Sequence, residues 1–221
     1  MLGKIRWGSI RRPKMERSEV CGLPVLQLVL PERIRDKAHL VGKGLHLLSK
    51  RGITRVLVPK DWIFWPQLVQ NGLRTVDTRA FQCAFVPSWV KFLLKEKDIA
   101  PDEATLLLKG EQESGDMERV ARLLCPLVRN IAIDVPGRAN LAAGLRREFG
   151  LPVLPARNVQ ADLTVFFSPV PMLPELDFQI AGELSLPAEY DPLPILSVLW
   201  ESGRIQVEDI VLKTAGNVDF P

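Results

Sequence analysis

The sequence predicts an α/β fold in which parallel strands alternate with helices. Short apolar runs have the length and composition of buried strands, and stretches with apolar residues at helical spacing lie between them. The order strand, helix, strand, helix, strand occurs twice along the 221 residues. The composition agrees, because 47% of the residues are hydrophobic and 25% are charged, as in ordinary globular proteins.

The first half opens with an expected strand at residues 3–10 and a polar turn at 11–18. A continuous apolar run at 24–30 indicates a strand buried on both faces. The helix expected at 36–50 contains Gly42 and Gly44, which indicate close packing of this helix on a sheet. Strands at 53–58 and 73–76 then flank a short helix that begins near Pro66 and ends at Gln70.

The second half repeats this order after a long helical stretch at 79–97, which Pro87 is expected to kink or to split. Helices are expected at 116–124 and 137–149, where apolar residues recur at helical spacing. The expected strands are residues 104–109, 130–135, 151–154 and 162–167.

Two β-α-β-α-β halves predict a Rossmann-like, doubly wound, mostly parallel sheet of strand order 3-2-1-4-5-6, with residues 162–167 as its sixth strand. A basic N-terminal arm or hairpin, residues 1–20, precedes this domain at 21–168. The halves of the domain are 21–77 and 100–168, and residues 79–98 form the crossover helix. A Pro-rich α+β appendage, residues 169–221, is expected to pack on the sheet with strands at 178–186 and 209–213 and a helix at 193–201.

Charge and cysteine content narrow the classes of function. The first twenty residues hold six cations and two carboxylates, a net +4, which leaves −1 for the rest of a chain of net charge +3. Nucleic-acid binding would depend on this short arm, and a solvated tail or hairpin is the commoner structure. Three well-separated cysteines predict reduced thiols in a cytoplasmic, soluble protein, and no segment has the length and apolarity of a signal peptide or a membrane span.

Ligands of open α/β sheets bind outside the carboxyl ends of the strands, where the strand order reverses. In the predicted sheet, two loops border that crevice: residues 31–35 and residues 109–115. Arg33 and Arg35 of the first loop, with Lys109, Gly110 and Ser114 of the second, are therefore candidate ligand-binding residues. The alternative for the second loop is an acidic first turn that complements the helix dipole.

The loop at 31–35 has no glycine, so the G-x-G-x-x-G grip on a pyrophosphate is missing there. We therefore expect no cofactor, and the sequence argues against NAD and FAD. A third loop adds Gly137, Arg138 and Asn140 as candidates, because an arginine beside a strand end can pair with a carboxylate or phosphate. The alternative there is a tight strand-to-helix turn with a solvent-facing arginine.

Three aromatic residues in the loop after residues 53–58 form a further candidate surface for a partner or a ligand: Trp62, Phe64 and Trp65. The alternative is that they fold back as core beneath the C-terminal appendage. No nucleophile motif or metal motif is present, and the only histidines, His39 and His46, lie seven residues apart on one helix. We therefore expect no metal site.

The sequence favours a non-catalytic interaction or scaffold module with a Rossmann-like fold that lacks a dinucleotide fingerprint. The alternative is a small-molecule binder or enzyme, acting on a nucleotide or phosphorylated metabolite in the crevice. Fold alone does not choose between them. A protein partner or homo-oligomer is compatible with the first function.

Overall fold

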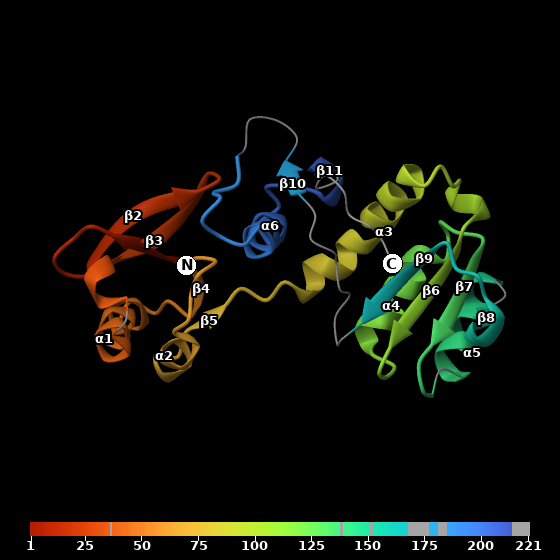
Figure 1. Cartoon of the computed structure of the whole chain (residues 1–221), viewed down its shortest axis with the longest axis horizontal. Coiled ribbons are helices and arrows are strands. Elements are labelled where there is room, and N and C mark those ends of the chain that lie inside the picture. The colour runs from red at the N-terminus through yellow and green to blue at the C-terminus, as the bar shows by residue number, and fades with distance from the viewer. Residues whose placement is uncertain (36, 138, 151–152, 168–176, 181–184, 214–221) are drawn as a thin grey trace. The chain divides into compact units, whose positions relative to one another are not determined.

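The computed structural model describes residues 1–35, 37–137, 139–150, 153–167, 177–180 and 185–213. It confirms the mixed α/β class with parallel sheets. The chain forms two compact units, shown in Figure 1, and each is described separately below. The first unit combines residues 1–78 with 180–206, and the second combines 79–179 with 207–221.

The first unit is built on a five-stranded sheet of order β2-β3-β1-β4-β5. Its four parallel strands are β1 (Leu2–Gly8), β3 (Leu23–Pro31), β4 (Arg55–Leu57) and β5 (Arg74–Thr75). The fifth strand, β2 (Lys14–Val20), runs antiparallel to β3 at one edge. The helices of this unit are α1 (Ala38–Ser49), α2 (Trp65–Gln70) and α6 (Pro192–Glu201), with a 3-10 turn at Glu32–Ile34.

The two faces of this sheet have different coverings because side chains alternate along each strand. Ile5 and Leu28 face the side of α1 and join its buried residues in one apolar core. Lys4 and Arg55 face the opposite side. There they contact residues 180–206, the returning segment, in which the chain comes back to the first unit. One face is therefore a helix-covered apolar core, and the other carries Lys4 and Arg55 beside buried apolar residues such as Val25 and Leu57.

Residues 1–20 form two strands of this sheet, which differs from the predicted arm or hairpin. β1 pairs with β3 along Leu2↔Val25 to Gly8↔Pro31 and with β4 on its other side, so it lies in the interior of the sheet. Leu2, Gly3 and Ile5 are buried. The cations of this segment are consequently spread over a sheet. Residues 1–20 therefore do not form the free basic arm on which nucleic-acid binding would depend.

The second unit has a four-stranded parallel sheet of order β8-β7-β6-β9. Its strands are β6 (Thr105–Gly110), β7 (Asn130–Asp134), β8 (Val153–Pro155) and β9 (Leu163–Phe167). Its helices are α3 (Arg79–Glu96), α4 (Gly115–Leu124) and α5 (Ala139–Phe149), with 3-10 turns at Pro101–Glu103, Ala156–Asn158 and Val207–Asp209. A separate two-stranded sheet pairs β10 (Asp177–Ile180) with β11 (Ile210–Lys213).

Each predicted half forms a sheet of its own, so the single six-stranded order 3-2-1-4-5-6 was wrong in this respect. That order required β3 and β6 to be neighbours at the centre. Instead, both edges of β3 are occupied, one by β1 and one by β2. The edges of β6 are occupied by β7 and β9. No edge is left for the two central strands to pair, and the helix at 79–96 opens the second unit rather than crossing over one sheet.

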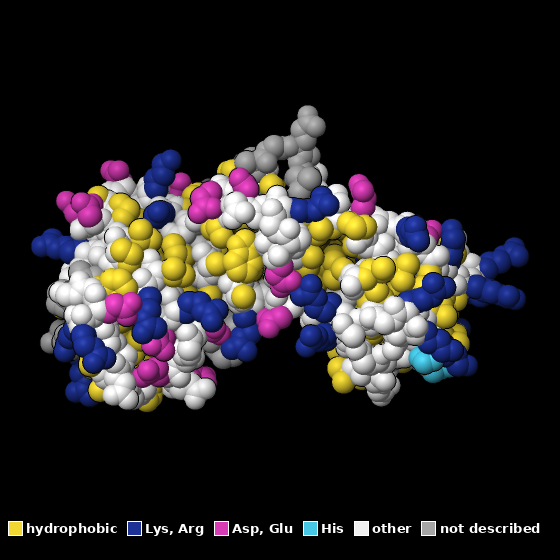
Figure 2. Space-filling model, turned by 180° about the vertical axis from the view of Figure 1, so that it is seen from behind, with side chains coloured by type: hydrophobic (Ala, Val, Ile, Leu, Met, Phe, Trp, Pro, Cys, Tyr) yellow, Lys and Arg dark blue, Asp and Glu magenta, His cyan; other side chains and the backbone are white. Residues whose placement is uncertain are grey.

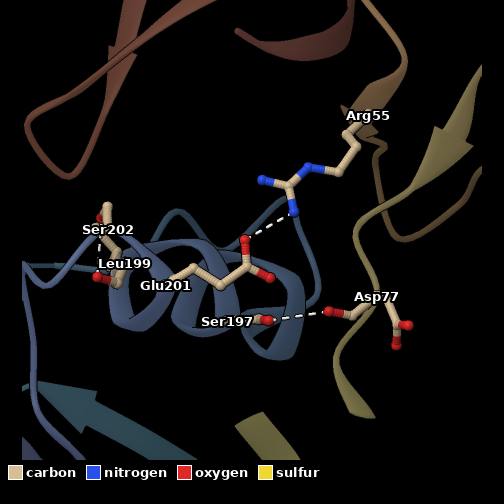
Figure 3. Close-up of polar contacts among 6 residues, drawn as sticks. All are labelled: Arg55, Asp77, Ser197, Leu199, Glu201 and Ser202. Carbon is tan, nitrogen blue, oxygen red and sulfur yellow. Dashed lines mark hydrogen bonds and ion pairs between the residues drawn. The ribbon is translucent and has the colours of Figure 1, made fainter. Parts of the chain in front are cut away.

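The predicted appendage at 169–221 is divided between the units. Its helix α6 belongs to the first unit, and Ile195, Leu196 and Leu199 of this helix are buried. Figure 3 shows how α6 is attached: Glu201 accepts a hydrogen bond of 2.7 Å from Arg55, and the Ser197 hydroxyl donates to the backbone oxygen of Asp77 at 3.0 Å. The returning segment is thus an integral layer of the first unit.

Two local expectations have clear outcomes. A Cβ at Gly44 would lie 2.4 Å from Cδ2 of Leu30, so Gly44 does permit close contact between α1 and the sheet. Gly42 has only ordinary contacts. Pro87 lies inside one helix that runs unbroken from Arg79 to Glu96, so it does not split the helix.

Candidate functional site

The structure assigns the two predicted loops to different units. Arg33 and Arg35 follow β3 in the first unit, whereas Lys109, Gly110, Ser114, Gly137 and Asn140 belong to the second. Arg138 lies outside the described residues. Each group is at the carboxyl edge of its own sheet, and the single crevice expected between β3 and β6 does not arise because these strands are not neighbours.

In the second unit, the loop between β6 and α4 is explained by packing and capping. A Cβ at Gly110 would lie 3.1 Å from the backbone oxygen of Phe167, which accounts for glycine at this position. Ser114 caps α4, because its hydroxyl accepts a hydrogen bond of 3.2 Å from the Met117 amide. Asp116 in the first turn pairs with Arg79 at 2.8 Å. Lys109, Gly137 and Asn140 are exposed or half-buried at this edge without a described ligand pocket.

The loop between β6 and α4 also contains part of the G-x-G-x-x-G pattern, which is missing from the loop at 31–35. Gly110 and Gly115 have the spacing of the first and last glycines of G-x-G-x-x-G, and Gln112 stands at the middle position. The middle glycine normally lets the backbone approach the pyrophosphate, and a glutamine side chain hinders that approach. The residues present therefore fit a dinucleotide poorly.

The first unit contains a pocket of about 400 Å³ at the carboxyl ends of β1 and β4. Four segments supply its walls: the end of β1, the turn after β3, the loop after β4 and the returning segment before α6. The lining residues are Arg6, Trp7, Arg35, Pro59, Lys60, Asp61, Ala188, Glu189 and Tyr190. The pocket lies at the carboxyl edge to which the strand-end rule points, and of the predicted ligand-binding residues Arg35 is in its lining.

Backbone and side-chain hydrogen bonds fix the returning segment against the sheet. The Tyr190 hydroxyl donates to the backbone oxygen of Ile5 at 2.9 Å, and the Lys60 amide donates to the backbone oxygen of Glu189 at 2.9 Å. Pro59 and Tyr190 also form an isolated antiparallel bridge. Burial raises the pKa of Tyr190 above its ordinary value, so its hydroxyl remains a donor at neutral pH.

Arg35 is held at the rim of the pocket by two contacts. It forms an ion pair with Asp61, and its guanidinium lies 5.5 Å from the ring centre of Trp7. Both side chains of the ion pair are half exposed, so the pair contributes little stability and serves mainly to orient the guanidinium. Arg33 instead donates to the backbone oxygen of Arg11 and does not line the pocket.

Two cations at the pocket have no ion-pair partner among the residues that the structure describes: Arg6 and Lys60. Both are exposed. The carboxylates that line the same pocket are already engaged, Asp61 with Arg35 and Glu189 with Lys4. Three cations and two carboxylates line the pocket, so its lining has a net positive charge. The sequence analysis named neither residue, although Lys60 lies three residues after the end of β4 and could have been found by the strand-end rule.

The aromatic residues of the loop after β4 divide between core and surface. Trp62 and Phe64 are buried, with ring centres 5.7 Å and 6.0 Å from that of Trp7. They join the core beneath α1 rather than a core beneath the appendage. Trp65 is 50% exposed, together with Ile63 at 68% and Val69 at 75%. Of the predicted aromatic surface, Trp65 alone is available to a partner.

The histidine and cysteine side chains do not form a second candidate site among the described residues. His39 and His46 are exposed on α1. Within the described parts of the chain, no cluster of three or more histidine, cysteine, aspartate or glutamate side chains could hold a metal ion. Burial raises the pKa of the Cys83 and Cys125 thiols to about 11, so both are protonated and unreactive at neutral pH. Figure 2 shows lysine and arginine side chains interspersed with carboxylates and apolar groups over the visible face.

Comparison with known proteins places the chain in no family. No family model matches the sequence, and no curated protein sequence matches it. Among solved structures, L-tryptophan dehydrogenase from Nostoc punctiforme is similar with a TM-score of 0.38 and 11% identity over 75% of this chain and 55% of that chain. A shikimate 5-dehydrogenase-like protein is similar with a TM-score of 0.30 and 12% identity, over 76% of this chain and 65% of that chain.

The chain spans between half and two thirds of the length of these two proteins. The assignment to the α/β class rests on the strand orders of the two sheets described above. No helix among the described residues combines the length and apolarity needed to cross a membrane.

Proposed function

We propose that the first unit binds a small anionic metabolite in the pocket at the carboxyl ends of β1 and β4. The observation that supports this most directly is the pair of exposed cations, Arg6 and Lys60, that line the pocket without an ion-pair partner among the described residues. A carboxylate or phosphate group is the natural partner of an arginine and a lysine that converge on one pocket.

The size and construction of the pocket agree with a small ligand. Its volume of about 400 Å³ lies within the usual range for ligand sites, roughly 300–1,000 Å³. Its walls come from four segments, and the hydrogen bonds of Tyr190 and Lys60 hold two of these segments together. Trp7 and the buried ring of Tyr190 supply apolar surface beside the cations. The arrangement suits binding of an organic anion.

Removing either free cation is expected to weaken anion binding. Arg6→Ala and Lys60→Ala should each raise the dissociation constant for the anions that bind, by roughly fivefold, because exposed charge pairs contribute up to about 1 kcal/mol. Isothermal titration calorimetry with the full chain, using succinate, malate and inorganic phosphate as probes, measures this directly. Added salt should weaken binding to the wild-type chain, since the cations are exposed.

Lys43→Ala provides the matched control, because Lys43 is an exposed lysine of the same unit on α1 and does not line the pocket. This variant changes the net charge by the same amount and should bind as the wild type does. Equal weakening by Lys43→Ala would show that net charge alone attracts the probes, and failure of all three probes to bind would count against the proposal.

A second candidate function, a non-catalytic interaction module, is supported by three exposed apolar residues at and just before α2. Trp65 and Val69 lie four residues apart on α2 and therefore share one face of the helix, with Ile63 just before it. Contiguous exposed apolar groups commonly mark protein–protein contacts, and a tryptophan at the centre is the usual hot spot. A second copy of the chain is the simplest partner to test.

Self-association through this surface should be sensitive to Trp65. If the wild-type chain dimerises, Trp65→Ser should raise the dimer dissociation constant by about tenfold or more, because tryptophan hot spots often contribute over 2 kcal/mol. Sedimentation equilibrium over a range of concentrations measures the effect. Leu123→Ser, which changes an exposed apolar residue of the second unit, serves as the control. A wild-type chain that remains monomeric at the highest concentration would argue against a second copy of the chain as the partner of this surface.

A further inference from the structure

Lys4 is a buried cation that contacts Glu189 and Tyr190, two residues that line the proposed pocket. It lies near the middle of β1 and is only 8% exposed. Its ammonium is 5.1 Å from the ring centre of Tyr190 and 3.9 Å from Oε1 of Glu189. Among the described residues, Glu189 is its one ion-pair partner. The charge of Lys4 is therefore largely removed from water and compensated by a single carboxylate.

The contact between Lys4 and Glu189 is loose. A separation of 3.9 Å exceeds the length of a hydrogen bond between nitrogen and oxygen. The Glu189 side chain is 59% exposed and lines the pocket, whereas its backbone oxygen is fixed by the Lys60 amide. The carboxylate also interacts with the Tyr190 side chain, and its exposure leaves it room to move into solvent while the segment that carries it stays in place. A buried ammonium with so weak a partner gains from an anion that makes a direct hydrogen bond.

We propose that Lys4 binds the carboxylate of an organic acid and that the Glu189 side chain is an internal competitor which this ligand displaces. This inference rests on the proposed function, and it specifies the ligand class. The space beside Lys4 already accommodates the planar carboxylate of Glu189, so a ligand carboxylate fits the same position. Arg6 and Lys60 then attract the anion into the pocket, and Glu189 sets the selectivity by excluding weaker anions from Lys4.

Removal of the competitor is expected to tighten binding. Glu189→Gln should lower the dissociation constant for succinate by about two- to fivefold, the effect of one exposed charge pair. Lys4→Met, which keeps most of the apolar stem, should weaken succinate binding by about tenfold or more, because a buried charge-assisted hydrogen bond is lost. Inorganic phosphate should respond less than succinate to Glu189→Gln. Glu19→Gln, at an exposed glutamate on β2, is the matched control.

The double variant Lys4→Met, Glu189→Gln separates a local effect from a general one. If Glu189 acts through Lys4, Glu189→Gln should give no gain when Lys4 is already methionine. A gain that persists in the double variant would mean that Glu189 only adds negative charge to the pocket, and the inference would be wrong. Because Glu189 is exposed, Glu189→Gln should fold normally and keeps the test decisive even if Lys4→Met fails to fold.

The outcomes distinguish this inference from the proposed function. Succinate binding to the wild type that is unchanged or weakened by Glu189→Gln overturns the role of Glu189 and leaves anion binding in place. Absence of binding to the wild type and to Glu189→Gln overturns both. Binding that emerges only in Glu189→Gln supports the competitor directly.

Discussion

Replacing Ile5 by alanine is expected to lower the unfolding free energy of the first unit by about 2–5 kcal/mol, the usual cost of truncating a fully buried isoleucine. Ile5 has no exposed surface and belongs to the apolar core that also contains Leu28 and Leu45. Its strand, β1, is paired on both sides, which restrains the backbone from moving into the cavity that the truncation leaves. The effect should be among the largest of any single truncation in this unit.

Tryptophan fluorescence in urea can isolate this unit. Four of the five tryptophans, at positions 7, 62, 65 and 200, lie in the first unit, and Trp89 lies in the second. A Trp89→Phe background therefore leaves a signal from the first unit alone. Val69→Ala, which truncates an exposed aliphatic residue of the same unit, should change stability by less than about 0.5 kcal/mol. If Ile5→Ala costs no more than Val69→Ala, residues 1–20 are a separable arm after all.

The history of β1 shows what the sequence could and could not predict about the fold. The strand itself was expected at 3–10, and the structure has it at Leu2–Gly8. Its interior position was not expected, because Lys4 and Arg6 interrupt the apolar pattern that normally identifies a buried strand. Lys4 is accommodated by Glu189 and Tyr190, which follow more than 180 residues later, and Arg6 is exposed at the end of the strand. Strand pairing is decided by such distant contacts, whereas local periodicity reports only the element.

The candidate site could likewise be predicted only where local sequence patterns reveal it, because some of its residues come from a distant segment. The rule that ligands bind at carboxyl strand ends led to Arg35, which does line the pocket. Glu189 and Tyr190 were missed because they come from a segment that the sequence presented as an appendage. The alternation in residues 61–65 could have separated core from surface, since Trp62 and Phe64 are buried and Ile63 and Trp65 are exposed. Alternation with a period of two is a local pattern, and it can be seen in the sequence of residues 61–65.

Tyr190 should be the second large determinant of stability. Tyr190→Ala is expected to cost about 3–5 kcal/mol, the range for removal of a buried aromatic side chain. The ring is 2% exposed and packs beneath the ammonium of Lys4. Tyr190→Phe keeps the ring and removes only the hydrogen bond to Ile5, so it should cost about 1–2 kcal/mol. The same fluorescence measurement compares the two variants, and equal costs would mean that the hydroxyl, and not the ring, anchors the returning segment.

The alkaline titration of Tyr190 provides an independent test of this anchor. Burial, with a smaller contribution from Glu189, raises the pKa of the folded-state hydroxyl above its ordinary value near 10. The unfolded chain then loses this proton first, so the stability contribution is complete below about pH 10 and is lost as the pH rises toward the folded-state pKa. Because Tyr190 is the only tyrosine, tyrosinate absorbance reports this residue alone. The wild type should lose stability more steeply than Tyr190→Phe above that pH, and an ordinary tyrosinate titration in the folded protein would place Tyr190 in solvent and detach the returning segment from the sheet.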